Sequence, residues 1–404
     1  MGESKGAITN MYPELRLKQN RTASLVNHHP WIYSGALENI PESVSDGDLV
    51  SIVDGSGTPA AVGTFAAHSL ISVRVFHFGP AVIDKPWIFR RIQEAHQRRL
   101  LMGLGGPDVT GYRVVFGESD RLPGIVIDRY GDVFVIQLAT TGAERFRDII
   151  VACLVELFSP KAIYERSDLP SRTEEKLPPM TGLLYGELPP VVEFKEYGRS
   201  YMADVAGGQK TGFFLDQRDL RREITRLAPG RKAADLFSCT GACALAALAG
   251  GATSVDCVDS SEQALAFCPK HAEMNGLDPS RLTTETADVF QWVAARSDPE
   301  YDLIMLDPPA LIKSRRHYEA GRKGYHFLNR AALRLLKDGG ILVTSSCSAF
   351  FTEEDLAVTL RRGADQAGVE LSLLRTVRQS PDHPLSLHFP EAAYLKAFVC
   401  LVNR

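Results

Sequence analysis

The sequence predicts a multidomain α/β protein with a small N-terminal β-barrel, a middle α+β domain and a C-terminal domain built on a parallel sheet. Its length of 404 residues is typical of two or three domains of about 150 residues each. Strand-like runs dominate the first part of the chain, and strand–helix alternation begins at about residue 230. A composition of 45% hydrophobic and 23% charged residues indicates a globular protein with a buried core.

Residues 1–79 form the predicted β-barrel domain. Alternating or β-branched runs at 14–18, 48–54, 59–65 and 71–76 read as short strands, and polar turn sequences separate them. The N-terminal stretch MGESKGAITNMYPELRLKQN contains no apolar signal core. No apolar run in the chain approaches the roughly 20 residues of a membrane span. We therefore expect a cytoplasmic protein that is neither exported nor membrane-bound.

Residues 80–192 form the predicted middle domain. A helix at 85–103 ends at Gly103, and a hairpin at 122–137 closes around Tyr130-Gly131-Asp132. A second helix at 145–158 and a strand at 162–167 follow. The segment 168–192 is rich in proline and charge, which predicts a surface loop.

Residues 193–404 form the predicted C-terminal domain. Strands at 233–238, 254–259, 281–290, 302–306 and 341–348 alternate with helical segments. This alternation predicts a parallel sheet covered by helices on both faces. Ligands of such sheets bind at the carboxyl ends of the strands, which is where the polar residues of interest lie.

A cofactor loop is predicted after the first of these strands. Asp235 is followed by a turn at Gly241 and a helix of small residues, which lets a ligand approach the backbone closely. Asp259 ends the next strand and is placed to accept hydrogen bonds from ribose; the alternative is a helix N-cap, a role that Ser260 could equally fill. For Asp288, after the third strand, an N-cap and a ligand contact are equally open. The loop is not GxGxxG and no phosphate loop occurs, which disfavours nicotinamide-dependent dehydrogenases and nucleotide hydrolases.

Two further strand ends carry reactive groups. Asp307-Pro308-Pro309 follows a buried strand, and the two prolines stiffen a loop that suits recognition of a planar base edge. Cys347 follows the next sheet strand among hydroxyl residues, whereas Cys153, Cys257 and Cys400 lie in apolar runs typical of small buried residues. A thiolate nucleophile needs a polar or electropositive site. Cys347 is therefore either a catalytic nucleophile or a structural thiol. The seven scattered cysteines show neither a disulfide framework nor metal-ligand spacing, so no metal is expected.

Positive charge is concentrated in one segment of a chain whose formal net charge is −4. Between residues 313 and 337 a single acidic residue, Glu319, accompanies eight basic ones: Lys313, Arg315, Arg316, Arg322, Lys323, Arg330, Arg334 and Lys337. A polyanion would bind at such a place, and this run could also supply the field that activates Cys347.

The segment GQKTGFFLDQRDLRR at 208–222 allows two interpretations. Its basic and aromatic residues could close over a cofactor or contact RNA, with Gln217 and Arg218 as candidates. Alternatively, it is a helix entry in which Asp216 is the N-cap and Arg221 and Arg222 are solvated.

Five motifs in this order resemble the bacterial large-subunit ribosomal RNA methyltransferase I family: GESDRLPGIVIDRYGD, GQKTGFFLDQRDLRRE, DLFSCTGACALAALAGGA, LDPPALIKS and TSSCS. HHPWIYSGAL also resembles the start of that family's PUA domain. The resemblance implies a PUA domain, a middle α+β domain and a class I, Rossmann-like methyltransferase domain. It implies S-adenosylmethionine as cofactor and 5-methylcytosine as product. The implied partner is large-subunit ribosomal RNA or its assembly intermediate, with a homodimer left open.

The resemblance also implies roles for individual residues. The cofactor's methionine part would lie on the loop with Asp235, Phe237, Thr240 and Gly241, its ribose on Asp259 and Ser260, and its adenine near Asp288. Asp307 would border the cofactor and orient the target cytosine, and Cys347 would be the nucleophile. RNA contacts would come from Pro308, Pro309, Lys313, Arg315, Arg316, Gln217 and Arg218.

The chemistry explains these residue types. Carbon-5 of cytosine is a poor nucleophile until a thiolate adds to carbon-6, and a carboxyl group hydrogen-bonded at the ring nitrogen stabilises the product of that addition. Many RNA 5-methylcytosine enzymes carry a second cysteine where this chain has Ala310 after Pro309, so the base that removes the carbon-5 proton is unassigned. Three rival functions remain: an amine methyltransferase using the Asp-Pro-Pro loop, a non-catalytic RNA-binding assembly factor, and a small-molecule methyltransferase.

Overall fold

The computed structural model describes residues 11–404. The first ten residues, which include part of the stretch without a signal core, lie outside the described residues. The described chain forms two compact units: residues up to 194 with 203–213 and 381–392, and residues 195–202 with 214–380 and 393–404. Within the described range, no helix has the length and apolar character needed to traverse a bilayer.

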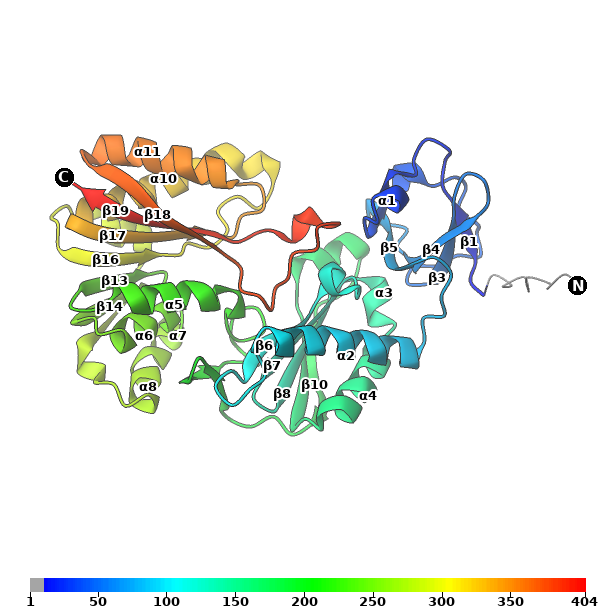
Figure 1. Ribbon diagram of the computed structural model, residues 1–404, viewed down its shortest axis with the longest axis horizontal. Coiled ribbons are helices and arrows are strands. Elements are labelled where there is room, and N and C mark those ends of the chain that lie inside the picture. Colours follow the sequence, from blue (N-terminus) through cyan, green and yellow to red (C-terminus); the bar gives the residue numbers. More distant parts are fainter. Residues whose placement is uncertain (1–10) are drawn as a thin grey trace, which may run out of the picture. The chain divides into compact units, whose positions relative to one another are not determined.

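The first unit begins with a five-stranded sheet in the order β1-β3-β4-β5-β2 (Figure 1). Its strands are β1 (Glu14–Arg16), β2 (Trp31–Tyr33), β3 (Leu49–Val53), β4 (Pro59–Phe65) and β5 (Ile71–Phe78), with the short helix α1 (Ala23–Val26) between β1 and β2. Their inward-facing apolar residues form a separate core. The four strands predicted in this region are thus present. The first of them, predicted at 14–18, forms a strand of only three residues, Glu14–Arg16.

The same unit contains a second five-stranded sheet, in the order β10-β9-β8-β7-β6, which packs against two helices. The strands are β6 (Gly111–Phe116), β7 (Ile125–Tyr130), β8 (Val133–Leu138), β9 (Ala162–Ser167) and β10 (Met180–Gly186), and the helices are α2 (Lys85–Leu101) and α4 (Arg147–Phe158). The short helix α3 (Thr141–Glu144) precedes α4. The predicted hairpin is β7–β8, which pair antiparallel from Tyr130 opposite Val133.

The prediction of a plain surface loop at 168–192 is wrong. This segment contains a 3-10 helix at Pro170–Glu175 and the edge strand β10, which pairs antiparallel with β9. Because an edge strand has one neighbour, β10 leaves most of its side chains exposed. Its composition therefore resembles that of a loop.

The second unit is built on a seven-stranded sheet in the order β15-β14-β13-β16-β17-β19-β18. The strands are β13 (Lys232–Leu236), β14 (Ser254–Asp259), β15 (Leu282–Thr286), β16 (Tyr301–Leu306), β17 (Leu336–Ser346), β18 (Glu370–Arg378) and β19 (Lys396–Asn403). The first five are parallel, as predicted, whereas β19 runs antiparallel to both β17 and β18. The residues of a two-stranded hairpin, β11 (Val192–Glu196) and β12 (Arg199–Ala203), are divided between the two units.

Helices cover both faces of this sheet. One face carries α9 (Val289–Ala294), α10 (Tyr318–Leu335) and α11 (Glu353–Ala367), whose apolar residues form one core with alternate strand residues. The other face carries α5 (Arg218–Leu227), α6 (Ala242–Ala249) and α8 (Phe267–Met274), with the single-turn α7 (Glu262–Leu265) before α8. Side chains of a strand alternate between faces. Successive residues near a strand end therefore point to different layers.

Candidate functional site

The carboxyl ends of four adjacent strands bring the predicted reactive residues to one edge of the sheet. The order β14-β13-β16-β17 places Asp259, Asp235, Asp307 and Cys347 at neighbouring strand ends. In this arrangement the sheet reverses its direction of growth between β13 and β16, which is the position where open α/β sheets bind ligands. The sequence-predicted residues therefore lie at the edge of the sheet where open α/β sheets bind ligands.

The predicted cofactor loop is a tight turn between β13 and α6. Phe237, Cys239 and Gly241 have φ angles of 64°, 49° and 73°, so the backbone is in the left-handed region at three of five residues. A side chain at Gly241 would place its Cβ 2.4 Å from Cys268 Sγ, and glycine is thus required there. Thr240 and Phe237 are half-buried, and the Phe237 ring meets Phe290 edge-on at 6.1 Å.

Asp235 fixes this loop to the following helix. Its Oδ2 accepts a hydrogen bond from the Ala244 N–H at 2.8 Å. Burial, the largest cause, acts together with the charges of Asp307 and Asp259 to raise the pKa of Asp235 to about 7. Three carboxyl groups near one another create a site that favours a cationic ligand.

Asp259 accepts backbone hydrogen bonds with both oxygens: Oδ2 from Cys239 N and Oδ1 from Ser261 N, each at 2.9 Å. The N-cap of α7 is Ser261, whose hydroxyl accepts from Ala264 N. The alternative that Asp259 or Ser260 caps this helix is therefore wrong, and Ser260 is exposed. Each oxygen of Asp259 retains a second lone pair for a ligand hydroxyl.

Asp288 is the N-cap of α9. Its Oδ1 accepts a hydrogen bond from Gln291 N at 2.9 Å, and its side chain is exposed next to Phe290. The capping role, one of the two left open, is thus present.

Asp307 lies directly after β16 between two donors. Gln217 Nε2 donates to its Oδ2 at 2.5 Å, and the Ser345 hydroxyl donates to its Oδ1. Both donors are uncharged groups, an amide and a hydroxyl, and together they fix the orientation of the Asp307 carboxylate. Pro308 is buried and Pro309 exposed. The stiff loop therefore presents one proline outward beside an oriented carboxylate.

The helix-entry interpretation of 208–222 is wrong in two respects. Asp216 does not cap α5: its Oδ2 accepts from the Tyr394 hydroxyl at 2.5 Å, and the N-cap position has no side-chain bond. Arg221 is buried and forms two 2.6 Å hydrogen bonds with the Glu196 carboxylate. Of the two candidates for cofactor or RNA contact, Gln217 is buried and donates to Asp307, and its contact with cofactor or RNA stays a prediction. Arg218 is fully buried 3.5 Å from Glu196, where its side chain offers RNA no surface.

Cys347 begins a turn that is tied to the loop after Asp307. The hydroxyls of the flanking residues Ser346 and Ser348 each lie 2.9 Å from the Tyr325 hydroxyl. The Ser348 hydroxyl also accepts from Ile312 N at 3.2 Å. Cys347 itself is half-buried. The network therefore fixes the backbone on both sides of a partly accessible thiol.

Sequence reasoning missed a buried cation at the Cys347 turn, Lys396. Lys396 is 6% exposed and its Nζ donates to the Ser348 carbonyl at 2.6 Å. Burial lowers the pKa of Lys396 to about 8, and Cys347 acts in the opposite direction. The signal available in the sequence was a single lysine in the apolar run YLKAFVCLV.

His271 is a second residue that sequence reasoning missed. It is buried in α8, its Nδ1 donates to the Thr240 carbonyl at 3.0 Å, and its Nε2 accepts from Met202 N at 3.0 Å. These two bonds require the neutral ring, and burial lowers the pKa of His271 to about 4. A neutral histidine thus holds the cofactor loop against β12.

We predict that His271 makes this unit acid-sensitive. The unfolded chain protonates near pH 6.5 and the folded one near pH 4, so stability is lost as the pH falls through this window, by up to about 3 kcal/mol. Thermal unfolding of wild type and His271→Gln at pH 4 to 7 measures this dependence. The variant should show a shallower loss than wild type, and parallel curves would contradict the prediction.

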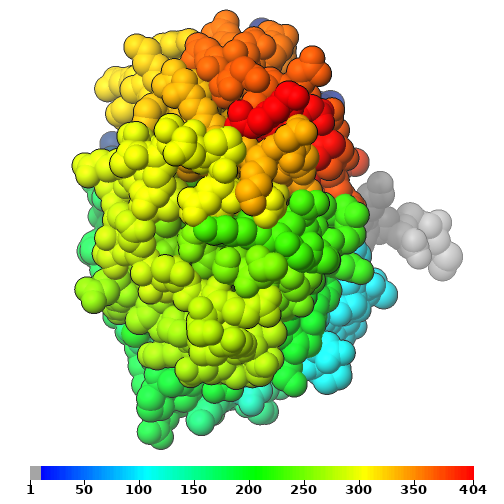
Figure 2. Space-filling view, turned by 90° about the vertical axis from the view of Figure 1, so that its left-hand side faces the viewer, coloured from blue at the N-terminus to red at the C-terminus, as the bar shows by residue number. Residues whose placement is uncertain are grey.

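The predicted basic run lies mostly at the surface of the second unit. Lys313, Arg315 and Arg316 are exposed and form no ion pair with any residue in the described range 11–404. Arg322 pairs with Glu319, and Lys337 pairs with Asp302. The yellow part of the chain, which includes the start of this run, forms much of the surface in Figure 2. The first three cations are therefore available to a polyanion.

Comparison with known proteins decides the family. A PUA-like domain model matches residues 15–78 and an S-adenosylmethionine-dependent methyltransferase model matches residues 180–398. Ribosomal RNA large subunit methyltransferase I of Klebsiella pneumoniae strain 342 is 37% identical over 398 residues, covering 97% of this chain and 99% of its own length. The enzyme of the same name from Shigella boydii serotype 4 is 38% identical, covering 97% and 100%. The chain belongs to the ribosomal RNA large subunit methyltransferase I family.

Solved structures agree on the fold of this methyltransferase I family member. A protein described as a methyltransferase and complexed with SAH superimposes with a TM-score of 0.83 at 24% identity, covering 96% of this chain and 100% of its own. A protein from Streptococcus mutans that is described as an S-adenosylmethionine-dependent methyltransferase superimposes on this chain with a TM-score of 0.81 at 24% identity. The predicted fold class, family resemblance and cofactor, S-adenosylmethionine, are confirmed.

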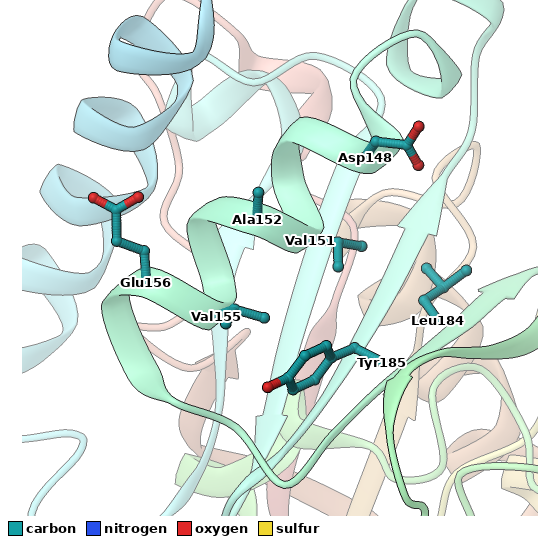
Figure 3. Close-up of a pocket in the computed structure, with 7 residues that line it drawn as sticks. All are labelled: Asp148, Val151, Ala152, Val155, Glu156, Leu184 and Tyr185. Carbon is teal, nitrogen blue, oxygen red and sulfur yellow. The ribbon is translucent and has the colours of Figure 1, made fainter.

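An apolar groove in the middle region of the chain shares no lining residue with the candidate site at the edge of the methyltransferase sheet. It has a volume of about 450 Å³ and lies between α4 and β10, where Val151, Val155, Leu184 and Tyr185 line it (Figure 3). None of the predicted site residues lines it. Among residues 11–404, no group of three His, Cys, Asp or Glu side chains is arranged to hold a metal.

Proposed function

We propose that this chain methylates carbon-5 of a cytosine in large-subunit ribosomal RNA and that Cys347 is the covalent nucleophile. The observation that carries the proposal is the pairing of a half-buried thiol after β17 with an oriented carboxylate after β16. The relatives' name, ribosomal RNA large subunit methyltransferase I, supports the RNA substrate. The exposed basic residues and the PUA-like domain support RNA binding.

The residues at this edge fit S-adenosylmethionine. Glycine at 241 allows the left-handed φ of 73° in the tight turn and lets Cys268 pack directly against it. Asp235, Asp259 and Asp307 together favour a cation, and the sulfonium and ammonium groups of the cofactor are cationic. Asp259 would accept from the ribose hydroxyls, and Phe237 with the region of Asp288 would border the adenine. When bound, the cofactor supplies an electrophilic methyl group.

The protein's own residues would then act on the base. The Cys347 thiolate adds to carbon-6 of the cytosine, and the electron pair of the carbon-5–carbon-6 double bond moves onto the ring. Asp307, held by Gln217 and Ser345, stabilises the altered ring through a hydrogen bond at its polar edge. After carbon-5 is methylated, loss of its proton restores the double bond and expels the thiolate. The base must be unstacked to reach this turn.

Two other functions make different demands on these residues. Methylation of an amino group would use the Asp-Pro-Pro loop alone and needs no thiol. A non-catalytic assembly factor needs neither Asp307 nor Cys347. Methylating ribosomal RNA with the purified protein and identifying the modified nucleoside by mass spectrometry separates the three, with 5-methylcytosine expected. An N-methylated nucleoside, or none, would contradict the proposal.

The proposal places the enzyme in the cytoplasm, where its RNA substrate is made. None of the seven cysteines forms a disulfide in the described residues 11–404, which accords with a reducing compartment. A homodimer stays a prediction.

If Asp259 binds the ribose of the cofactor, replacing Asp259 should lower the affinity for S-adenosylmethionine measurably. Asp259→Ala removes a charged acceptor and should weaken S-adenosylmethionine binding by about 1.5–3 kcal/mol in calorimetry. Asp278→Ala, which removes an exposed carboxylate on a distant turn, is the matched control and should bind like wild type. Equal affinities of Asp259→Ala and wild type would overturn the assignment.

The assignment of Arg315 and Arg316 to RNA binding predicts a change in salt dependence. Replacing both by glutamine should weaken RNA binding and make the slope of log K against log salt shallower by about 1.4–1.8, because two phosphate contacts are lost. The exposed pair Arg361 and Arg362 on α11 provides a control with the same charge change. An unchanged slope in the Arg315/Arg316 variant would show that these arginines only face solvent.

A further inference from the structure

The first residue of β19 is a lysine held inside the sheet. In the antiparallel pair β17–β19, Lys396 lies opposite Ser346, one residue before Cys347. Its side chain is only 6% exposed, and the residues that follow it in the strand, Ala397, Phe398 and Val399, are apolar and buried. Burying an ammonium group is costly unless other groups compensate for its lost hydration.

The compensating groups all lie around the Cys347 turn. Lys396 Nζ donates to the Ser348 carbonyl at 2.6 Å. The charged or chargeable groups that act on Lys396 are Cys347, Glu353 and Asp355, the two acids belonging to the first turn of α11. Both acids have other partners: Glu353 accepts from Arg378, and Asp355 from Tyr318 and Thr352. Cys347 is the first of the three in its effect on Lys396.

We propose that Lys396 is a positioning residue for Cys347: it anchors the turn through Ser348 and favours the thiolate form of the nucleophile. This inference rests on the proposed function of Cys347. A Coulomb interaction is mutual, so a cation that is stabilised by the thiolate stabilises it equally. The ammonium form of Lys396 predominates at neutral pH because its pKa of about 8 lies above 7.

The thiols of the two other cysteines near this edge are dominated by burial and by acidic neighbours, although Arg221 acts in the opposite direction on Cys243. Burial raises the pKa of Cys239 to about 12 and that of Cys243 well above its ordinary value, and acidic neighbours act in the same direction on both. These two thiols are therefore held neutral. Cys347 differs from both because a buried lysine, Lys396, is bonded to its own turn.

The test is the rate at which iodoacetamide alkylates Cys347 at pH 7 in the full-length protein without RNA, followed by peptide mass spectrometry. Thiolates react and thiols do not. Lys396→Met should slow alkylation by about tenfold, the effect of one pKa unit. Lys396→Arg should restore most of the rate. Lys232→Met, at the opposite end of the sheet and paired with Glu300, should react like wild type.

A further variant separates charge from folding. Lys396→Gln keeps a donor for the Ser348 carbonyl without the charge, so it should fold, bind S-adenosylhomocysteine and still react slowly. In RNA methylation, Lys396→Gln should lower kcat with little change in KM. Alkylation of Lys396→Gln at the wild-type rate would overturn the inference. If Cys347→Ala retained methylation, the proposed function would fail, while the alkylation rates would still decide whether Lys396 acts on Cys347.

Discussion

Replacing Cys347 by alanine is expected to abolish methyl transfer, lowering kcat by about 10³-fold or more, which is the scale for loss of a covalent nucleophile. Cofactor binding and folding should change little. The thiol is half-buried after the end of β17, and the bonds that fix the turn come from Ser346, Ser348 and Lys396. Methylation kinetics, calorimetry with S-adenosylhomocysteine and thermal unfolding give the three readouts.

RNA that contains 5-fluorocytosine should trap the wild-type enzyme as a covalent adduct, because fluorine at carbon-5 cannot leave as a proton does. The adduct should be absent with Cys347→Ala and present with Cys239→Ala and Cys243→Ala. These controls matter because both cysteines lie in or next to the cofactor loop, although their thiols are held neutral. Full activity of Cys347→Ala would rule out the thiolate mechanism and favour methylation of an amino group.

The second large effect is expected for Asp307→Asn. Asp307 accepts from Gln217 and Ser345, and an amide in its place would turn an NH₂ group toward one of these donors. The orientation would be lost, and so would the carboxyl group that can hold a proton at the ring nitrogen of the altered base. We expect kcat to fall by about 100- to 1000-fold, as for other single electrostatic contacts to a transition state.

The matched control for this variant is Asp302→Asn. Asp302 lies at the start of the same strand, accepts from Lys232 N and pairs with Lys337. Its change should leave kcat near the wild-type value. A similar kcat for Asp307→Asn and wild type would show that the carboxylate only supports the loop.

Local patterns were sufficient to predict most of the fold. Strand–helix alternation after residue 230 predicts the five parallel strands, and the turn signal at Tyr130-Gly131-Asp132 predicts the β7–β8 hairpin. The antiparallel strands β18 and β19 were not predicted, because an extended run does not reveal the direction of its partner. β10 was missed because an exposed edge strand has the composition of a loop.

The strand-end rule also placed Asp235, Asp259, Asp307 and Cys347 at one edge of the sheet. It could not find contacts that depend on the pairing of distant segments. Lys396 meets the Cys347 turn only because β19 inserts beside β17, about fifty residues later in the chain. Arg221 of α5 is buried because the carboxylate of Glu196, on the β11–β12 hairpin, neutralises its charge. In both cases the sequence predicts a solvent-exposed side chain, because the partner that neutralises or binds it comes from a distant segment.

The most direct test of the central claim is to map methylated nucleosides in large-subunit ribosomal RNA from a strain that lacks this protein. Mass spectrometry of the purified RNA should show that one 5-methylcytosine disappears and that the wild-type gene restores it. The gene encoding Cys347→Ala should not restore it. An unchanged 5-methylcytosine content, or loss of an N-methylated nucleoside instead, would contradict the account.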